Sequence, residues 1–393
     1  MRLVALLLTA ASCAHADDWR GSWDGALYGY AGHARLRNDA VLNPGNRVAR
    51  LARDSGTLEA RFNFKAENDA LRLTMRPIVL AQQSDQARQN EAYLSLWQVR
   101  LRATDTWSVA AGRELLNWGP AQFRSPSSPF YFDNGRSNPM RELSGLDALK
   151  LSWNPDLQHT LMLAHISGSG HVARDPWRDS WLLKADLRGT DWASGLALAQ
   201  TPGQGLFAGL HGQQNASDAL LLYAEAATST QADALQSPAD PALPFGVAAR
   251  SPRRATVLLG ASYTLDNGQS LYAELLHSGH GYHAEEQRAY FARAANALPA
   301  AGMALRYAPP LLGRDYLHLV WQSNLMESGG YWRLMATKSF TDGGSELACY
   351  AETTLSPEIS AFLLAALPTG SARQEFSSLM RANLNAGLKI SLP

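Results

Sequence analysis

Hydrophobic and polar residues alternate strictly along several segments of this chain. The pattern is clearest in 58–66, 71–76 and 380–392, and in the first of these Glu59 and Arg61 lie between leucine, alanine and phenylalanine residues. A period of two is typical of a β-strand, because successive side chains point to opposite faces. Charged residues on one face and a long apolar row on the other are typical of a strand that crosses a bilayer in a barrel.

The same reading along the whole chain predicts an all-β fold, an antiparallel transmembrane β-barrel of about eighteen strands. A soluble sandwich also alternates, but an alternating run as long as 380–392 favours a closed barrel. The predicted strands are 23–36, 56–66, 70–82, 91–104, 106–115, 146–154, 158–167, 177–188, 191–200, 203–212, 218–228, 254–265, 268–278, 300–308, 314–324, 330–340, 344–355 and 377–392.

The connections provide an independent check, because outer-membrane barrels alternate short periplasmic turns with longer external loops. Connections after even-numbered strands are short and rich in turn residues, and they include 67–69, 266–267, 309–313 and 341–343. Connections after odd-numbered strands are mostly long. In the last long one, 356–376, Ser356 and Pro357 predict a helix start, and Ile359, Phe362, Leu363 and Ala366 form an apolar stripe.

The N-terminus predicts export. Arg2 precedes an apolar run and the small residues Ala14 and Ala16, which together indicate a signal peptide over 1–16 and a single barrel domain over 17–393. Cys13 leaves the alternative of a lipoprotein. We therefore expect the cell outer membrane of a Gram-negative bacterium, with membrane lipid, lipopolysaccharide and the barrel-assembly machinery as partners.

The amino-acid composition argues against several classes of function. Thirty-five basic residues balance thirty-five acidic ones, which argues against nucleic acid as a partner. One cysteine, Cys349, remains after the signal peptide, so neither a disulfide nor a cysteine metal site is expected. His277, His280 and His283 could bind zinc or copper, but ordinary solvated histidines are favoured, so we expect no metal and no cofactor. Without a serine motif beside His318, we expect no enzyme.

If the apolar rows face lipid, the interleaved residues face the lumen. Strands two to five then contribute a basic wall, and Glu225 and Glu274 lie inward from later strands. Such a wall orients polar solutes in a water-filled pore; the alternative is that the charges pair and fill a closed lumen. The predicted pore-lining residues are Arg61, Arg72, Arg76, Arg100, Arg102 and Arg113.

The third external loop, 116–145, is rich in proline, glycine, aromatic and arginine residues, which indicates a folded loop. It occupies the position of the constriction loop of general porins. The predicted constriction residues are Trp118, Arg124, Asp133, Arg136, Arg141 and Glu142.

Short motifs in and just before this loop resemble those of a known protein family. Gly112-Arg113, Trp118-Gly119-Pro120 and Asn134-Gly135-Arg136 resemble the signature of the capsule-assembly outer-membrane barrel family, whose members are eighteen-stranded and bind surface polysaccharide. The overall plan is equally similar to eighteen-stranded porins and to alginate-export barrels, which pass an anionic polymer. The two functional hypotheses are a channel for polar, anionic or saccharide solutes, and a polysaccharide-binding barrel with a blocked lumen.

Overall fold

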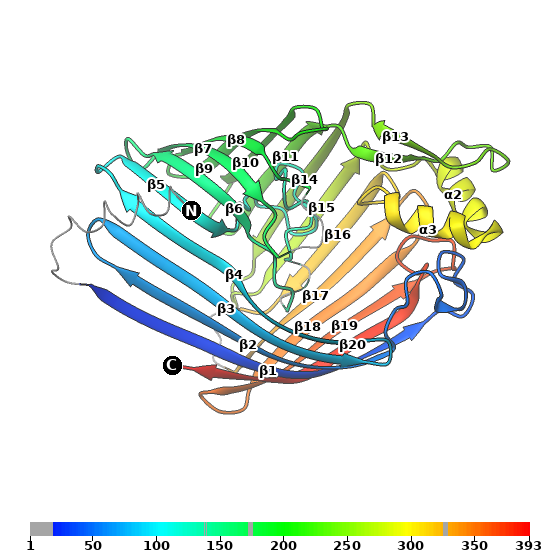
Figure 1. Ribbon diagram of the computed structural model, residues 1–393, viewed down its shortest axis with the longest axis horizontal. Helices are drawn as coiled ribbons and strands as arrows, with labels where there is room; N and C mark the ends of the chain where they lie inside the picture. Colours follow the sequence, from blue (N-terminus) through cyan, green and yellow to red (C-terminus); the bar gives the residue numbers. More distant parts are fainter. Residues whose placement is uncertain (1–18, 137, 139, 172–175, 325–328) are drawn as a thin grey trace.

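A closed ring of antiparallel strands forms almost the whole molecule (Figure 1). The computed structural model describes residues 19–136, 138, 140–171, 176–324 and 329–393; the predicted signal peptide and Cys13 lie outside this part. Each strand pairs with the next along the chain, and β1 (Arg20–Leu36) also pairs with β20 (Met380–Leu392), with Leu27 opposite Ile390. Because first and last strands meet, the sheet has no free edge.

Eighteen of the described strands make this ring, as the alternation predicts. β12 and β13 form a separate hairpin in the connection between β11 and β14. The remaining elements are η1 (Pro44–Asn46), β2 (Asp54–Glu67), β3 (Leu71–Ser84), β4 (Arg88–Arg102), β5 (Trp107–Glu114), β6 (Leu146–Trp153), β7 (His159–Gly168), β8 (Ser180–Arg188), β9 (Trp192–Gln200), β10 (Phe207–Asn215), β11 (Leu220–Ser229), β12 (Ala232–Gln236), β13 (Gly246–Arg250), β14 (Arg254–Thr264), β15 (Ser270–Ser278), α2 (Ala284–Asn296), α3 (Leu298–Tyr307), β16 (Asp315–Gln322), β17 (Gly330–Ser339), β18 (Ser345–Thr354) and β19 (Ile359–Thr369).

The exposure of side chains is reversed relative to a soluble protein. On β2, Leu58 is 68% exposed and Phe64 is 44% exposed, whereas Glu59 and Arg61 between them are 8% and 7% exposed. The apolar rows therefore face outward and the charged rows inward. Tryptophans sit at the strand ends of this outer surface, where an interfacial girdle is expected; Trp107 and Trp153 stack there at 5.9 Å.

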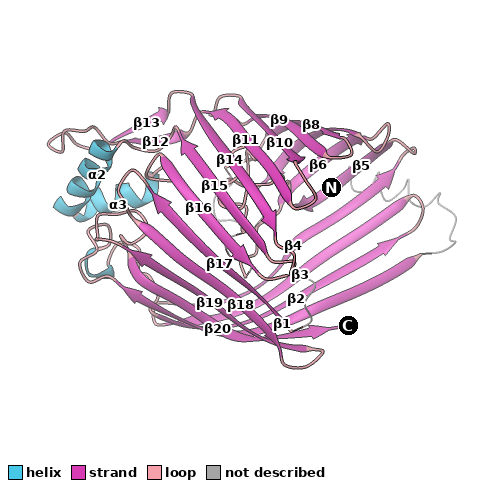
Figure 2. Ribbon diagram, turned by 180° about the vertical axis from the view of Figure 1, so that it is seen from behind, coloured by secondary structure: helices cyan, strands magenta, loops and turns pink. Residues whose placement is uncertain are grey.

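Most of the long connections lie at one end of the barrel, and short turns join the strands at the other end (Figures 1 and 2). We call them the long-loop end and the short-turn end. α2, α3 and the β12–β13 hairpin lie together at the long-loop end, where Tyr282, Tyr290, Phe291 and Leu235 share a small apolar core. Within the described part of the chain, no helix has the length and apolarity needed to span a membrane.

One predicted strand is a helix, and one observed strand was predicted as a loop. The number of strands in the ring is therefore still eighteen. Residues 300–308, predicted as a strand, lie mostly in α3, where Ala301 and Ala304 are fully buried three residues apart. Residues 359–369, predicted as part of a loop with a helix start, form β19. Phe362 and Leu364 of β19 are buried inward while its leucines 363 and 367 are exposed, so both faces are apolar and the period of two is hidden.

These two errors also change which end of the barrel several connections occupy. Residues 309–313, predicted as a periplasmic turn, follow α3 at the long-loop end. The connection 340–344, which contains the predicted periplasmic turn 341–343, follows β17 at the same end. The predicted long loop 356–376 is divided by β19 into a short turn, 355–358, and a loop at the opposite end, 370–379.

Candidate channel constriction

The loop between β5 and β6, residues 115–145 apart from 137 and 139, folds into the barrel and contacts its wall in several places. Leu116, Phe130 and Tyr131 pack against the inner face of β6 to β9. Phe123 packs with Tyr223, Leu258 and Tyr316 on the wall formed by β11 to β16. We call residues 115–145 the lumen loop. Because the lumen loop contacts both parts of the wall from the inside, it narrows the interior of the barrel.

Glu225 on β11 is the first anchor of the lumen loop. Its carboxylate accepts hydrogen bonds from the amide of Ala121 (2.9 Å), the hydroxyl of Ser125 (2.6 Å), and both the amide (3.1 Å) and hydroxyl (2.8 Å) of Ser127. Glu225 is fully buried, so these four donors replace the water that its carboxyl oxygens would bind on the surface.

Glu274 on β15 is the second anchor. It accepts from the amides of Gln122 (2.6 Å) and Phe123 (2.9 Å), and from the hydroxyl of Tyr223 (2.7 Å). Next along this wall, Arg333 of β17 donates to the side-chain oxygen of Gln122 at 2.9 Å. Residues 121–127 therefore lie along the wall as a short run of backbone held by two buried carboxylates.

Close packing at Gly119 makes the first anchor possible. Gly119 has a φ of +91°, and a Cβ on it would lie 2.4 Å from Oε1 of Glu225. The carbonyls of Gly119, Pro120 and Ala121 all accept from the guanidinium of Arg136, at 2.9, 2.6 and 2.6 Å. The predicted constriction residue Arg136 thus holds the turn that presents the loop to Glu225.

Glu142 is the third anchor, on the opposite side of the lumen. It accepts from Ser95 of β4 at 2.7 Å and lies 3.5 Å from Arg61 and 3.2 Å from Arg76. Arg61 is also bidentate to Glu59, at 2.8 and 3.0 Å. Arg61 and Arg76, both predicted in the basic wall, therefore meet Glu142, which was predicted in the loop. Glu142 neutralises charge on both arginines, and Glu59 also neutralises Arg61.

Among the other predicted loop residues, Arg124, Asp133 and Arg141 line the long-loop side of this barrier, and Trp118 lines its short-turn side. Arg124 and Arg141 flank Asp133, at 3.4 and 2.5 Å. Burial opposes ionisation of Asp133, but these two guanidinium groups lower its pKa below the usual value. Trp118 donates its ring N–H to the carbonyl of Ser127 at 3.0 Å, and Lys184 of β8 lies over its ring at 5.2 Å.

The other predicted arginines lie away from the lumen loop. Arg72 and Arg100 are directly opposite each other on β3 and β4, near the short-turn end, and Arg102 is two residues further along β4. Arg72 pairs with Glu67 at 2.7 Å, and Arg100 donates to Ser108 at 3.2 Å.

Arg113 is held within the barrel wall. It is bidentate to Asp147 of β6, at 2.9 and 3.0 Å, and it donates to the carbonyl of Leu94. The structure does not bring Arg113 to the group formed by Glu142, Arg61 and Arg76.

A chamber of about 700 Å³ lies between the lumen loop and the wall formed by β5 to β10. Trp118 and Pro120 of the loop line it, and wall ion pairs join Lys150 to Glu114 and Lys184 to Asp186. Both signs of charge are thus present in the chamber beside the lumen loop.

Sequence reasoning placed Glu225 and Glu274 inward but missed their role as anchors. The available signal was a single carboxylate in the inward row of β11 and of β15, where the other inward residues are tyrosine, leucine, alanine and serine. Nothing in the sequence indicated which loop each carboxylate would meet.

The three clustered histidines diverge. His277 pairs with Asp315 at 2.7 Å, His280 hydrogen-bonds Ser229 at 3.1 Å, and His283 is the N-cap of α2. In the described residues no group of three or more histidine, cysteine, aspartate or glutamate side chains is arranged to hold a metal ion.

A closed eighteen-stranded barrel with an inward-folded loop has the architecture of outer-membrane porin structures. No protein-family model matches the chain, and no curated protein matches it. The fold, however, matches many solved structures.

Three of these structures show the extent of the match. Acinetobacter baumannii OccAB1 aligns with a TM-score of 0.61 and 11% identity, covering 96% of this chain and 97% of that one. Pseudomonas aeruginosa OccK2 (OpdF) aligns with a TM-score of 0.57 and 13% identity over 95% and 97%. Pseudomonas aeruginosa OprD aligns with a TM-score of 0.54 and 11% identity over 95% and 95%. The resemblance to capsule-assembly and alginate-export barrels is not confirmed by these comparisons.

Proposed function

We propose that this protein is an outer-membrane channel for polar solutes, with the long-loop end outside the cell and the short-turn end in the periplasm. The observation that carries the proposal is the lumen loop, which is fixed to opposite walls by Glu225, Glu274 and Glu142. A loop held by buried carboxylates at defined positions sets a pore width, whereas a closed lumen would need no such precise support.

We further propose that the solutes are anionic or saccharide. At the short-turn end, Lys65, Arg72, Arg100 and Arg102 stand on adjacent strands with Glu67 among them. The side chains of Lys65 and Arg72 are 42% and 45% exposed, so their charge is available to a solute. Positive charge in a narrow pore raises the local concentration of anions. A structure with the same fold, OccK2 (OpdF), is a complex with glucuronate, an anionic sugar.

The test is single-channel conductance of the refolded protein in a planar bilayer, with ion selectivity read from the reversal potential in a salt gradient. We expect steady anion-selective steps, and weaker selectivity when Arg72, Arg100 and Arg102 are changed to glutamine. Arg288→Gln is the matched control, because Arg288 lies exposed on α2. Absence of conductance from a correctly folded barrel would overturn the proposal and favour a polysaccharide-binding barrel.

A further inference from the structure

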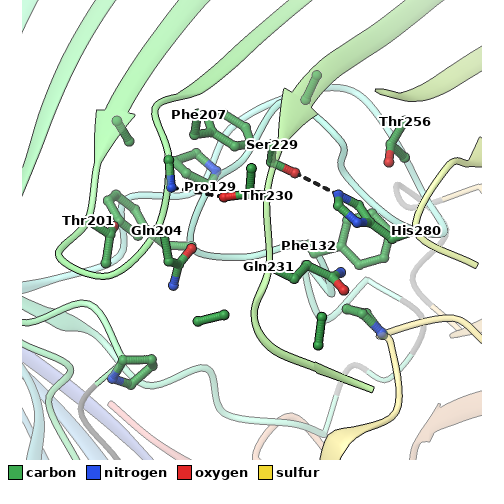
Figure 3. Close-up of a pocket in the computed structure, with 18 of the residues that line it drawn as sticks. Pro129, Phe132, Thr201, Gln204, Phe207, Ser229, Thr230, Gln231, Thr256 and His280 are labelled. Atoms are coloured by element: carbon green, nitrogen blue, oxygen red, sulfur yellow. Dashed lines mark hydrogen bonds between the residues drawn. The ribbon is translucent and has the colours of Figure 1, made fainter. Parts of the chain in front are cut away.

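A second cavity, of about 620 Å³, opens near the long-loop end, apart from the chamber beside the constriction. The lumen loop, the ends of β9 to β11, and the segment after α3 line it. Figure 3 shows Thr201 and Gln204 on one side, Thr256 and His280 on the other, and Ser229 and Thr230 between them. Its volume is that of a small-molecule site.

The polar lining is composed almost entirely of neutral hydrogen-bonding groups. The side-chain amides of Gln204 and Gln231 and the hydroxyl of Thr256 have no hydrogen-bond partner within the described parts of the chain, so they are available to a ligand. Asp233 and Arg306 are the lining residues that carry a full charge.

Internal hydrogen bonds fix the other polar groups of the lining. Ser229 hydrogen-bonds His280 at 3.1 Å, and Thr230 accepts from the amide of Gly205 at 2.9 Å (Figure 3). Burial and the charge of Arg254 lower the pKa of His280 to about 4, so its ring is neutral near pH 7.

Aromatic rings supply the rest of the lining. Phe132 and Phe130 come from the lumen loop, Phe207 from the start of β10, and Trp177 from the loop before β8. Phe130 and Trp177 meet edge to face at 5.3 Å, which fixes both rings. Gly209 lets the lumen loop pack closely beside Phe207, because a Cβ there would lie 2.8 Å from the carbonyl of Ser127.

We propose that this cavity binds an uncharged saccharide. A sugar ring presents apolar C–H faces and a rim of hydroxyl groups, so it needs flat aromatic surfaces together with neutral donors and acceptors. The cavity offers both, and a charged ligand would find few partners there. Because the cavity opens near the long-loop end and binding there requires no passage through the barrel, the inference does not depend on the channel function.

Binding can be measured by isothermal titration calorimetry with maltose, on barrel refolded in a detergent that has no sugar headgroup. We expect maltose to bind, and the double variant Gln204→Ala/Gln231→Ala to bind it at least tenfold more weakly. The matched control is Gln86→Ala/Gln89→Ala, which removes two amides at the β3–β4 turn, outside the cavity lining. The control should bind as the unchanged protein does.

Phenol and glucuronate distinguish the ligand classes in the same experiment. Phenol binding without maltose binding would show an apolar pocket and overturn the inference. Stronger binding of glucuronate than of maltose, or maltose binding that the double variant leaves unchanged, would also overturn it. A barrel that binds maltose without conducting ions would refute the proposed channel and leave this inference standing.

Discussion

The carboxylate of Glu225 lies directly against Gly119, so closely that the space contains no room for a Cβ atom on the glycine. This contact joins the middle of β11 to the lumen loop, which begins after β5. Any side chain at position 119 must therefore displace either the loop or the carboxylate that holds it. The fit between these two residues explains why the loop has one position in the lumen.

Gly119→Ala should destabilise the lumen loop. The backbone at φ +91° costs roughly 1–2 kcal/mol for a residue with a Cβ, and the contact with Glu225 adds to this. We expect a lower unfolding free energy in urea and noisier single-channel currents. Gly203→Ala is the control, since Gly203 also has a positive φ, +77°, but no atom within 4 Å of its Cβ position. Equal losses in both variants would show that the Glu225 contact contributes nothing.

Glu225→Ala should release the loop more completely. It leaves the donors of Ala121, Ser125 and Ser127 without their acceptor, and each buried donor left without a partner costs about 1–3 kcal/mol. We expect roughly 3 kcal/mol or more of lost stability and a larger conductance, both measured on the refolded barrel. The loss of stability in Glu225→Gln should be smaller than in Glu225→Ala, because an amide keeps one acceptor oxygen. Glu358→Ala, in an exposed turn, should change neither quantity.

Glu142→Gln should raise anion selectivity. The change removes the negative charge 3.2 Å from Arg76 and 3.5 Å from Arg61, while Arg61 keeps Glu59. A unit charge a few ångströms from an ion contributes about 1 kcal/mol even in water, so the anion-to-cation permeability ratio should rise roughly fivefold. The reversal potential in a salt gradient measures this ratio. Glu285→Gln on the exposed face of α2 is the control; an unchanged ratio in Glu142→Gln would mean that ions do not pass this ion-pair group.

The structure places residues 358 and 373 at opposite ends of the barrel, whereas the sequence pattern predicts both at the same end. Cysteine labelling can test which placement is right. The sequence placed both in one external loop, whereas β19 now separates them by the height of the barrel. In a Cys349→Ser background, an impermeant maleimide should label Arg373→Cys on intact cells, but Glu358→Cys only after the cells are permeabilised. Labelling of both on intact cells would contradict the strand assignment of 359–369.

Lowering the pH should reduce the local stability of the segment around His280, which lines the cavity. The pKa of His280 is lowered to about 4 by burial and by Arg254, so the folded state binds its proton less readily than the unfolded chain. The associated stability is therefore fully present above about pH 6.5 and is lost as the pH falls through 4. The protection factors of segment 278–283 in hydrogen exchange, which allow for the slower intrinsic exchange of amides in acid, should fall over this range by about 2 kcal/mol after allowance for partial exposure. His280→Gln should remove this dependence; an identical pH profile would exclude His280 as the cause.

The alternation of residues by itself determined the fold class. Charged residues such as Arg61 between outward rows such as Leu58 and Phe64 require a water-filled or polar interior and an apolar exterior, and only a closed barrel provides both. The inward placement of Glu225, Glu274 and His318 also follows from the period of two. Where both faces of a strand are apolar, as in β19, this signal vanishes, and an alanine-rich segment such as α3 can then be mistaken for a strand.

Only the tertiary structure decided how the loop fills the barrel. The loop partners of Glu225 lie about a hundred residues away in sequence, and those of Glu274 about a hundred and fifty. Such contacts depend on the path of the loop through the lumen, which is set by packing of Phe123, Phe130 and Tyr131 on the inner face of the wall. The sequence likewise shows which arginines face inward, but not that Glu142 returns from the loop to neutralise Arg61 and Arg76. Local patterns determine the face on which a side chain lies; long-range packing determines what it meets there.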